Sequence, residues 1–365
     1  MNMYPTDYQY LYQKPECSAL IRGTNKDFEV TELAAFELDG QGEHWYIKIQ
    51  KDGENTDWVA KQLAKYFNVT DKEIGYAGKK DRHAITQQWF SVCLPGVKTI
   101  DLSSFSCANI QVLDVQKHSR KLRTGALKGN KFKLRLTHVS DDLAFAERLL
   151  LIKDGVPNYF GEQRFGIQGA NLSRGISLLK AEFKERNRNK KGLYISAVRS
   201  WFFNHLLSKR IEKRLWQTLL TGDVVMLEGS KSHFLVDDLC QIQSRLQQRD
   251  LHITGPLWGR GQPLVAEEAA KWESEQLIEH LSLLERLEQM GLSQERRALR
   301  VLPGELQGEC LEVGTWSISF TLPPGCFATS VLRELCDYSA APRQTKDQQS
   351  IVNTHKNECT ADKAL

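Results

Sequence analysis

Residues Gly75–Val92, GYAGKKDRHAITQQWFSV, combine one acid in a cationic turn with a strand-like run. The acid is Asp81, and its neighbours are Lys79, Lys80 and Arg82. Because nearby positive charge favours an ionised carboxylate, Asp81 is expected to act as a nucleophile or electrostatic group, not as an acid. The β-branched and aromatic residues of 84–92 predict a strand that begins directly after this loop. An ordinary charged turn, in which Asp81 only accepts backbone hydrogen bonds, is the alternative.

The sequence around this stretch predicts further strands and helices. Segments 27–32 and 44–50 alternate in polarity, which predicts two strands paired through the turn Gly40-Gln41-Gly42. Thr56 is the expected N-cap of a helix whose apolar face packs in the core. Strands are expected again at 110–115 and 131–137, and a helix over 143–153 with Asp141 or Asp142 as its cap.

The middle of the chain differs from its two ends. From Gly155 to about Leu299 the apolar spacing predicts mainly helices, including 196–220 and 266–289. Residues 310–322 alternate as a single strand and return to the character of the first half. These changes predict a domain built from 1–155 and 305–342, interrupted by an inserted α/β domain at 156–304. The polar residues 343–365 are expected to form a disordered tail.

The charge of the chain is unevenly distributed. The net charge is only +4, so a surface for nucleic acid must come from local clustering. Between Gln116 and Arg135 there are eight Lys or Arg residues and no acid. A solvated surface is the usual interpretation of such a run, but the interleaved apolar residues favour a face directed at a polyanion.

Other patterns narrow the class of protein. The eight cysteines form no C-x-x-C pair, which indicates reduced thiols in a cytoplasmic protein. A long apolar run and a leader segment are both lacking, so no membrane association is expected. The chain also lacks G-x-G-x-x-G, a P-loop and metal-ligand spacing. We therefore expect no cofactor and no metal.

Several segments together resemble the TruD family of tRNA pseudouridine synthases. In the stretch quoted first, the family pattern of G, K, D, A, T and Q is matched by Gly78, Lys80, Asp81, Ala84, Thr86 and Gln88. Further segments that match the family occur in the family's order, at 26–32, 120–132, 158–166, 187–204 and 322–335. The resemblance extends over most of the chain. The resemblance implies an α+β pseudouridine synthase fold, with a mostly antiparallel central sheet flanked by helices and an inserted TruD domain.

The resemblance also implies roles for individual residues. Asp81 corresponds to the family's essential carboxylate. Phe132 matches the residue that stacks on the uracil, with Asn130 reading its edge. Arg22, Lys80 and Phe28 complete the implied substrate-binding set. From residue type alone, Phe132 would be assigned to the core, and Arg22 to the surface. The basic residues expected to bind the RNA backbone are Lys117, Arg120, Lys121, Arg123 and Lys128.

The activity implied is isomerisation of uridine 13 of tRNA to pseudouridine, with base flipping and no cofactor. We expect a cytoplasmic, monomeric protein whose partner is tRNA. A non-catalytic RNA-binding or RNA-chaperone protein is the alternative. A metal-dependent nuclease is disfavoured, because Asp81 has no acidic neighbour in its motif.

Overall fold

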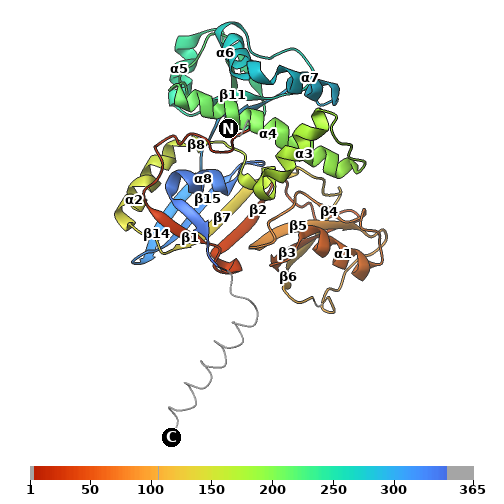
Figure 1. Ribbon diagram of the computed structural model, residues 1–365. Coiled ribbons are helices and arrows are strands. Elements are labelled where there is room, and N and C mark those ends of the chain that lie inside the picture. Colours follow the sequence, from red (N-terminus) through yellow and green to blue (C-terminus); the bar gives the residue numbers. More distant parts are fainter. Residues whose placement is uncertain (1–3, 106, 343–365) are drawn as a thin grey trace. The chain divides into compact units, whose positions relative to one another are not determined.

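The computed structural model describes residues 4–105 and 107–342, and the chain divides into two compact units. Of the described residues, the sheet unit comprises 16–105, 107–146, 304–324 and 337–342. The helical unit comprises 4–15, 147–303 and 325–336. Figure 1 shows both units and labels many of their helices and strands. The tail expected at 343–365 lies outside the described residues, and the inserted domain at 156–304 stays a prediction.

The sheet unit is built from strands and two helices. The division between the units falls within the second helix, α2. Its elements are β1 Ser18–Ile21, η1 Asn25–Asp27, β2 Phe28–Ala34, β3 His44–Asp52, α1 Thr56–Phe67, β4 Gly75–Tyr76, β5 Ile85–Cys93, β6 Ile110–His118, β7 Leu127–Thr137, α2 Asp142–Leu151, β14 Gly304–Glu312, β15 Thr315–Leu322 and β16 Asp337–Ala340.

These strands form one ten-stranded sheet with the path β14-β15-β7-β2-β5-β3-β6. β1 joins it through β7, β16 pairs with β1, and β4 pairs with β5. All pairs are antiparallel except β2–β5 and β1–β16. The expected α+β class with a mostly antiparallel sheet is therefore confirmed.

One expected strand pair is wrong. β2 and β3 do not pair with each other, because β5 lies between them, parallel to β2 and antiparallel to β3. Alternation shows which face of a strand is buried but does not identify its neighbours. The result places the strand after Asp81 in the centre of the sheet.

Helix α1 covers one face of β3 and β5. Val59 and Leu63 are fully buried and pack with Ile47, Ile49 and Phe90. Alternate residues of a strand point to opposite faces, so Lys51 lies on the same face as Ile47 and Ile49. Thr56 is the first residue of α1 and not its N-cap, which is Asn55. Asp141 caps α2 as expected, since its Oδ1 accepts hydrogen bonds from the N–H groups of Leu143 and Ala144.

The expectation of one strand at 310–322 is wrong, because the segment contains the end of β14, a turn and the whole of β15. β14 and β15 are antiparallel neighbours and are joined through Val313 and Gly314. Gly314 has a φ of 74°, a left-handed conformation that glycine adopts without steric cost. This short turn reverses the chain inside a segment that the alternation alone predicts to be one continuous strand.

The helical unit has a small antiparallel sheet in the order β10-β9-β11-β12 and a two-stranded pair, β13-β8. Its elements are η2 Ile152–Asp154, β8 Val156–Pro157, η3 Glu162–Phe165, η4 Ile167–Gly169, α3 Ala170–Leu179, α4 Arg188–Glu212, β9 Val224–Leu227, β10 His233–Leu235, α5 Leu239–Gln247, β11 Leu251–Leu257, α6 Glu267–Leu277, η5 Ile278–His280, α7 Leu281–Gln289, β12 Glu295–Ala298, β13 Arg300–Val301 and α8 Ala328–Leu335.

Helix α4 is the central element of this unit (Figure 1). Trp201, Phe202 and Phe203 are buried in one cluster with Val225 and Ile253 of the small sheet. The helix begins before the expected Ser196, because the side chain of Asn187 accepts hydrogen bonds from two N–H groups of its first turn. The helix expected at 266–289 is two helices, α6 and α7, separated by η5. None of the helices in the described part of the chain is long and apolar enough to cross a membrane.

Candidate active site

The Asp81 loop connects β4 to β5, and its carboxylate is bound by an arginine from elsewhere in the chain. Arg22 Nη2 donates to Asp81 Oδ2 over 3.1 Å. The side chain of Asp81 is 34% exposed and that of Arg22 only 16%. The carboxylate is thus held on one side and open to solvent on the other, as a group that must reach a substrate requires.

Arg22 is itself constrained. It follows β1 and has a φ of 60°, a conformation that costs a non-glycine residue of the order of 1 kcal/mol. Its guanidinium lies over the ring of Phe28, with Cζ 4.1 Å from the ring centroid. The ring and the carboxylate together fix the guanidinium in one place. A surface role for Arg22 does not account for these contacts.

The three cations next to Asp81 in sequence all have other partners. Lys79 Nζ lies 2.6 Å from Asp57 Oδ2, and Arg82 Nε donates to the carbonyl oxygen of Gly53 over 3.4 Å. Lys80 Nζ lies 2.6 Å from Glu32 Oε2, with side chains 5% and 0% exposed. Their charge surrounds Asp81, but none of the three makes an ion pair with it in the described residues.

The backbone of the loop is held by Lys51, a residue that the sequence did not single out. Lys51 is fully buried, and its Nζ donates to the carbonyl oxygens of Asp81 at 2.9 Å and Glu54 at 2.6 Å. Burial lowers the pKa of Lys51 to about 8; Asp81 and Glu54 oppose the shift, and Lys80 adds to it. The sequence contains a signal for this role, because Lys51 falls in the inward register of β3.

A second set of hydrogen bonds fixes the start of the loop. Gln88 Nε2 donates to the carbonyl oxygen of Gly78, and its Oε1 accepts from Thr56 Oγ1. Thr56 Oγ1 in turn accepts from the backbone N–H of Lys80 at 3.0 Å. Gln88 and Thr56 are both buried. The loop is therefore supported from β3, β5 and α1 rather than by its own turn chemistry, and the ordinary-turn interpretation does not explain this support.

Two chains of contacts connect the remaining expected residues to Asp81. Phe132 contacts Phe28 edge to face, and Phe28 carries the guanidinium of Arg22. Asn130 lies opposite Glu32 in the β2–β7 pair, and Glu32 binds Lys80. The structure thus brings together all six residues expected at the catalytic centre.

The side chain of Phe132 is closely packed, whereas that of Asn130 has a buried oxygen without a hydrogen-bond partner among the described residues. The ring of Phe132 is 7% exposed, and it stacks on Phe320 with ring centroids 5.4 Å apart. This burial is what a core residue also shows. Asn130 Oδ1 is buried without a hydrogen-bond partner among the described residues. An unpaired buried acceptor is costly, so a ligand donor that reaches it would be favoured.

The basic residues expected on the RNA backbone lie on β6, β7 and the connection between them. Gly125 in this connection donates to the carbonyl oxygen of Ala77, which places the connection against the Asp81 loop. Gly75 has no room for a side chain, because a Cβ there would be 2.4 Å from the carbonyl oxygen of Leu122. Two of the five lysines and arginines have internal acceptors: Lys117 Nζ donates to Val97, and Lys121 Nζ to Lys72. The side chains left exposed without an ion pair in the described residues are Arg120, Arg123 and Lys128.

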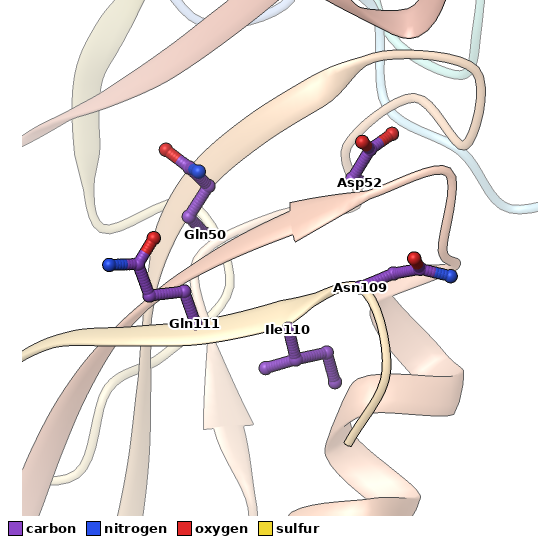
Figure 2. A pocket seen from close by; sticks show the side chains of 5 residues that line it. All are labelled: Gln50, Asp52, Asn109, Ile110 and Gln111. Atoms are coloured by element: carbon purple, nitrogen blue, oxygen red, sulfur yellow. The ribbon is translucent and has the colours of Figure 1, made fainter. Parts of the chain in front are cut away.

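A shallow pocket of about 210 Å³ lies elsewhere on this unit and is lined by Gln50, Asp52, Asn109, Ile110 and Gln111 (Figure 2). Gln50 and Gln111 face each other across the β3–β6 pair. Gln50 and Asp52 point to the opposite face of β3 from Lys51. The pocket therefore does not contain Asp81 or any other expected site residue. No group of three or more His, Cys, Asp or Glu side chains that could hold a metal converges within residues 4–105 and 107–342.

Comparisons with known proteins identify the family of the chain. The family model described as tRNA pseudouridine synthase D (TruD) matches residues 7–189 and 180–335. A relative named tRNA pseudouridine synthase D from Hydrogenovibrio crunogenus is 44% identical over 330 residues, covering 90% of this chain and 95% of its own. Another of the same name, from Colwellia psychrerythraea, is 41% identical over 360 residues, covering 96% and 98%.

The fold also matches a solved structure. A crystal structure of a Methanosarcina mazei protein that carries the name TruD superposes with a TM-score of 0.67. The match covers 92% of this chain and 96% of the other at 21% sequence identity. At this identity the likeness establishes the fold alone.

Proposed function

Because the chain belongs to the TruD family of tRNA pseudouridine synthases, we propose that it isomerises a uridine of tRNA to pseudouridine, with Asp81 as the catalytic carboxylate. The target we propose is uridine 13. The observation that carries the assignment is the partly exposed carboxylate of Asp81, held by Arg22 from a distant part of the chain. Such a carboxylate is oriented and accessible at the same time.

The reaction breaks the bond between N1 of uracil and C1′ of ribose, and joins C1′ to C5 of the same base. One proton leaves C5 and one is gained at N1, so the composition does not change. Asp81 acts in this scheme as a nucleophile on the sugar or base, or as the base that removes a sugar proton. All of these routes require an ionised carboxylate, which the Arg22 contact supports.

The other residues position the base. Flipping a uridine out of the RNA stack costs a few kcal/mol, which aromatic contact offsets in part. In the proposal Phe132 supplies that contact, and Asn130 Oδ1, which has no partner in the described residues, accepts from the N3–H of uracil. Phe28 and Arg22 keep the carboxylate of Asp81 in place. Lys80 supports the same loop through its ion pair with Glu32. Arg120, Arg123 and Lys128 bind phosphates.

We also propose that residues 1–155 and 305–342 form the catalytic domain and 156–304 an inserted one, in a monomeric, cytoplasmic enzyme. The alternative, a non-catalytic RNA-binding or chaperone protein, does not require the buried supports of the Asp81 loop. Mapping pseudouridine in tRNA from cells with and without the protein separates the two. Loss of pseudouridine at position 13 supports the enzyme; an unchanged map rejects it.

A further inference from the structure

The helical unit contains two arginines that lie on one aromatic ring, and neither has an acidic partner in the described part of the chain. Arg164 Cζ is 5.5 Å from the centroid of the Phe160 ring, and Arg297 Cζ is 4.2 Å from the same centroid. Among the residues that the structure describes, neither guanidinium makes an ion pair with an Asp or Glu. We call Arg164 and Arg297 the arginine pair.

This arrangement is unfavourable without a ligand. Burial lowers the pKa of Arg297, and the positive charge of Arg164 acts in the same direction. Burial also lowers the pKa of Arg164. Buried arginines are usually paired with carboxylates, because an uncompensated charge removed from water is costly. Arg210 and Arg296 of this unit follow that rule and bind Asp223 and Glu273, whereas the buried Arg300 donates to His252 and to two backbone carbonyls.

The donors of Arg164 are largely unused. Its Nη1 donates to Ser196 Oγ over 3.2 Å, and its Nε is buried with no hydrogen-bond partner in the described part of the chain. Arg297 is more fully engaged, because its Nε and Nη2 donate to Asn158. Arg297 therefore also holds the chain in place, whereas Arg164 has donors that no part of the protein requires.

The segment before α8 lies against the same two side chains. The ring of Phe327 is 5.9 Å from Arg164 Cζ, and the thiol of Cys326 interacts with Arg297. Phe327 occupies the N-cap of α8 and has no side-chain oxygen to accept from the first-turn N–H groups, of which that of Ser330 donates to the backbone carbonyl of Phe327. A helix N-terminus favours negative charge. Three positive features thus converge where the described chain provides no anion.

We propose that the arginine pair and the N-terminus of α8 bind a phosphate group of the RNA chain. Guanidinium groups match the geometry of phosphate oxygens and form charge-assisted hydrogen bonds with them. The choice of RNA as the source of the phosphate rests on the proposed function; the anion site itself does not. Free phosphate is the other source of the same chemistry.

The test compares tRNA binding by Arg164→Gln, by a matched control and by the parent across a range of salt concentrations. Arg286→Gln is the control, because it removes one exposed arginine of the same unit whose guanidinium contacts Gln289. Arg164→Gln should weaken binding roughly five- to tenfold near physiological salt and reduce the salt slope by about one unit. Arg286→Gln should leave both unchanged. Equal slopes for the parent and Arg164→Gln, with similar melting temperatures, would overturn the proposal.

A second experiment does not depend on tRNA. Inorganic phosphate should raise the melting temperature of the parent and of Arg286→Gln, relative to chloride of equal ionic strength, but not that of Arg164→Gln. Should the parent neither bind nor modify tRNA, the proposed function fails, and the phosphate response alone decides the anion site. A response that is equal in the parent and Arg164→Gln then rejects the site. A phosphate response specific to Arg164 with unchanged tRNA binding would identify a free-phosphate site and reject RNA as the ligand.

Discussion

Arg22 Nη2 lies 3.1 Å from Asp81 Oδ2, although 59 residues separate the two in sequence. The lysines and arginine beside Asp81 bind Asp57, Glu32 and the backbone of Gly53 instead. The charge that orients Asp81 therefore comes from the end of β1 and not from its own loop. From this contact we predict different effects for substitutions of Asp81 and of Arg22.

Asp81→Asn should abolish isomerisation while tRNA affinity stays within a few-fold of the parent. The side chain hardly changes in size but loses its charge, and the phosphate contacts are elsewhere. Single-turnover conversion of tRNA and equilibrium binding, measured on the same preparation, test this. Turnover at a rate comparable to the parent would mean that Asp81 is not the catalytic group.

Arg22→Gln should lower the single-turnover rate by about 10²-fold, because a misplaced reacting group has an effect of that order. Binding of tRNA should change little. Arg82→Gln is the matched control, since Arg82 is adjacent to Asp81 in sequence but donates to Gly53. If the two variants lost activity equally, local charge rather than the Arg22 contact would control Asp81.

Phe132→Ala should lower stability and, per folded molecule, the rate of catalysis. The ring is buried against Phe28 and Phe320, so its removal should cost about 3–5 kcal/mol of unfolding free energy. Phe320→Ala removes the stacked neighbour and should cost a similar amount. Of these two rings, only that of Phe132 is proposed to contact the uracil. Phe132→Tyr, which keeps the ring, should be milder. Equal single-turnover rates for folded Phe132→Ala and Phe320→Ala would leave Phe132 as a core residue.

Neutralising Arg120, Arg123 or Lys128 should reduce the salt slope of tRNA binding by about one unit each. Lys117→Gln and Lys121→Gln should have smaller effects, because both ammonium groups already donate to backbone carbonyls. Lys271→Gln, an exposed change in the helical unit, serves as the control. A triple variant of the first three with the parental slope would show that this surface does not face RNA.

Lys51 should make the stability of the protein increase with pH between about 8 and 10.5. Burial lowers the pKa of Lys51 to about 8 in the folded chain, below the ordinary value of 10.5. In this window the unfolded chain binds more protons, so rising pH favours the folded state. Below about pH 8, Lys51 is charged in both the folded and the unfolded state, so the folded state carries the full cost of burying the charge. Urea unfolding at pH 7 and pH 10 should show that the unfolding free energy of the parent minus that of Lys51→Met increases with pH. A constant or decreasing value of this quantity would contradict the assignment.

The sequence by itself determined the local features of the site. The strand after Asp81, the helix at 56–67 and the cap at Asp141 follow from alternation, helical spacing and side-chain chemistry, all of which act over a few residues. The motif residues also identified the family, because a motif is recognised from the order of its residues along the sequence and not from their spatial neighbours. Lys51 was readable in principle, because an inward register with a lysine in it is visible in the alternation of β3.

Only the tertiary structure decided which residues meet. Strand order is set by long-range hydrogen bonds, so alternation could not reveal that β5 separates β2 from β3. The same holds for charges: Lys80 is adjacent to Asp81 in sequence, yet its ammonium binds Glu32, whereas Arg22 reaches the carboxylate from another strand. Adjacency in the sequence ensures only that two residues have neighbouring backbones. The direction of a long side chain depends on which partner compensates its charge most fully once the strands have assembled around it.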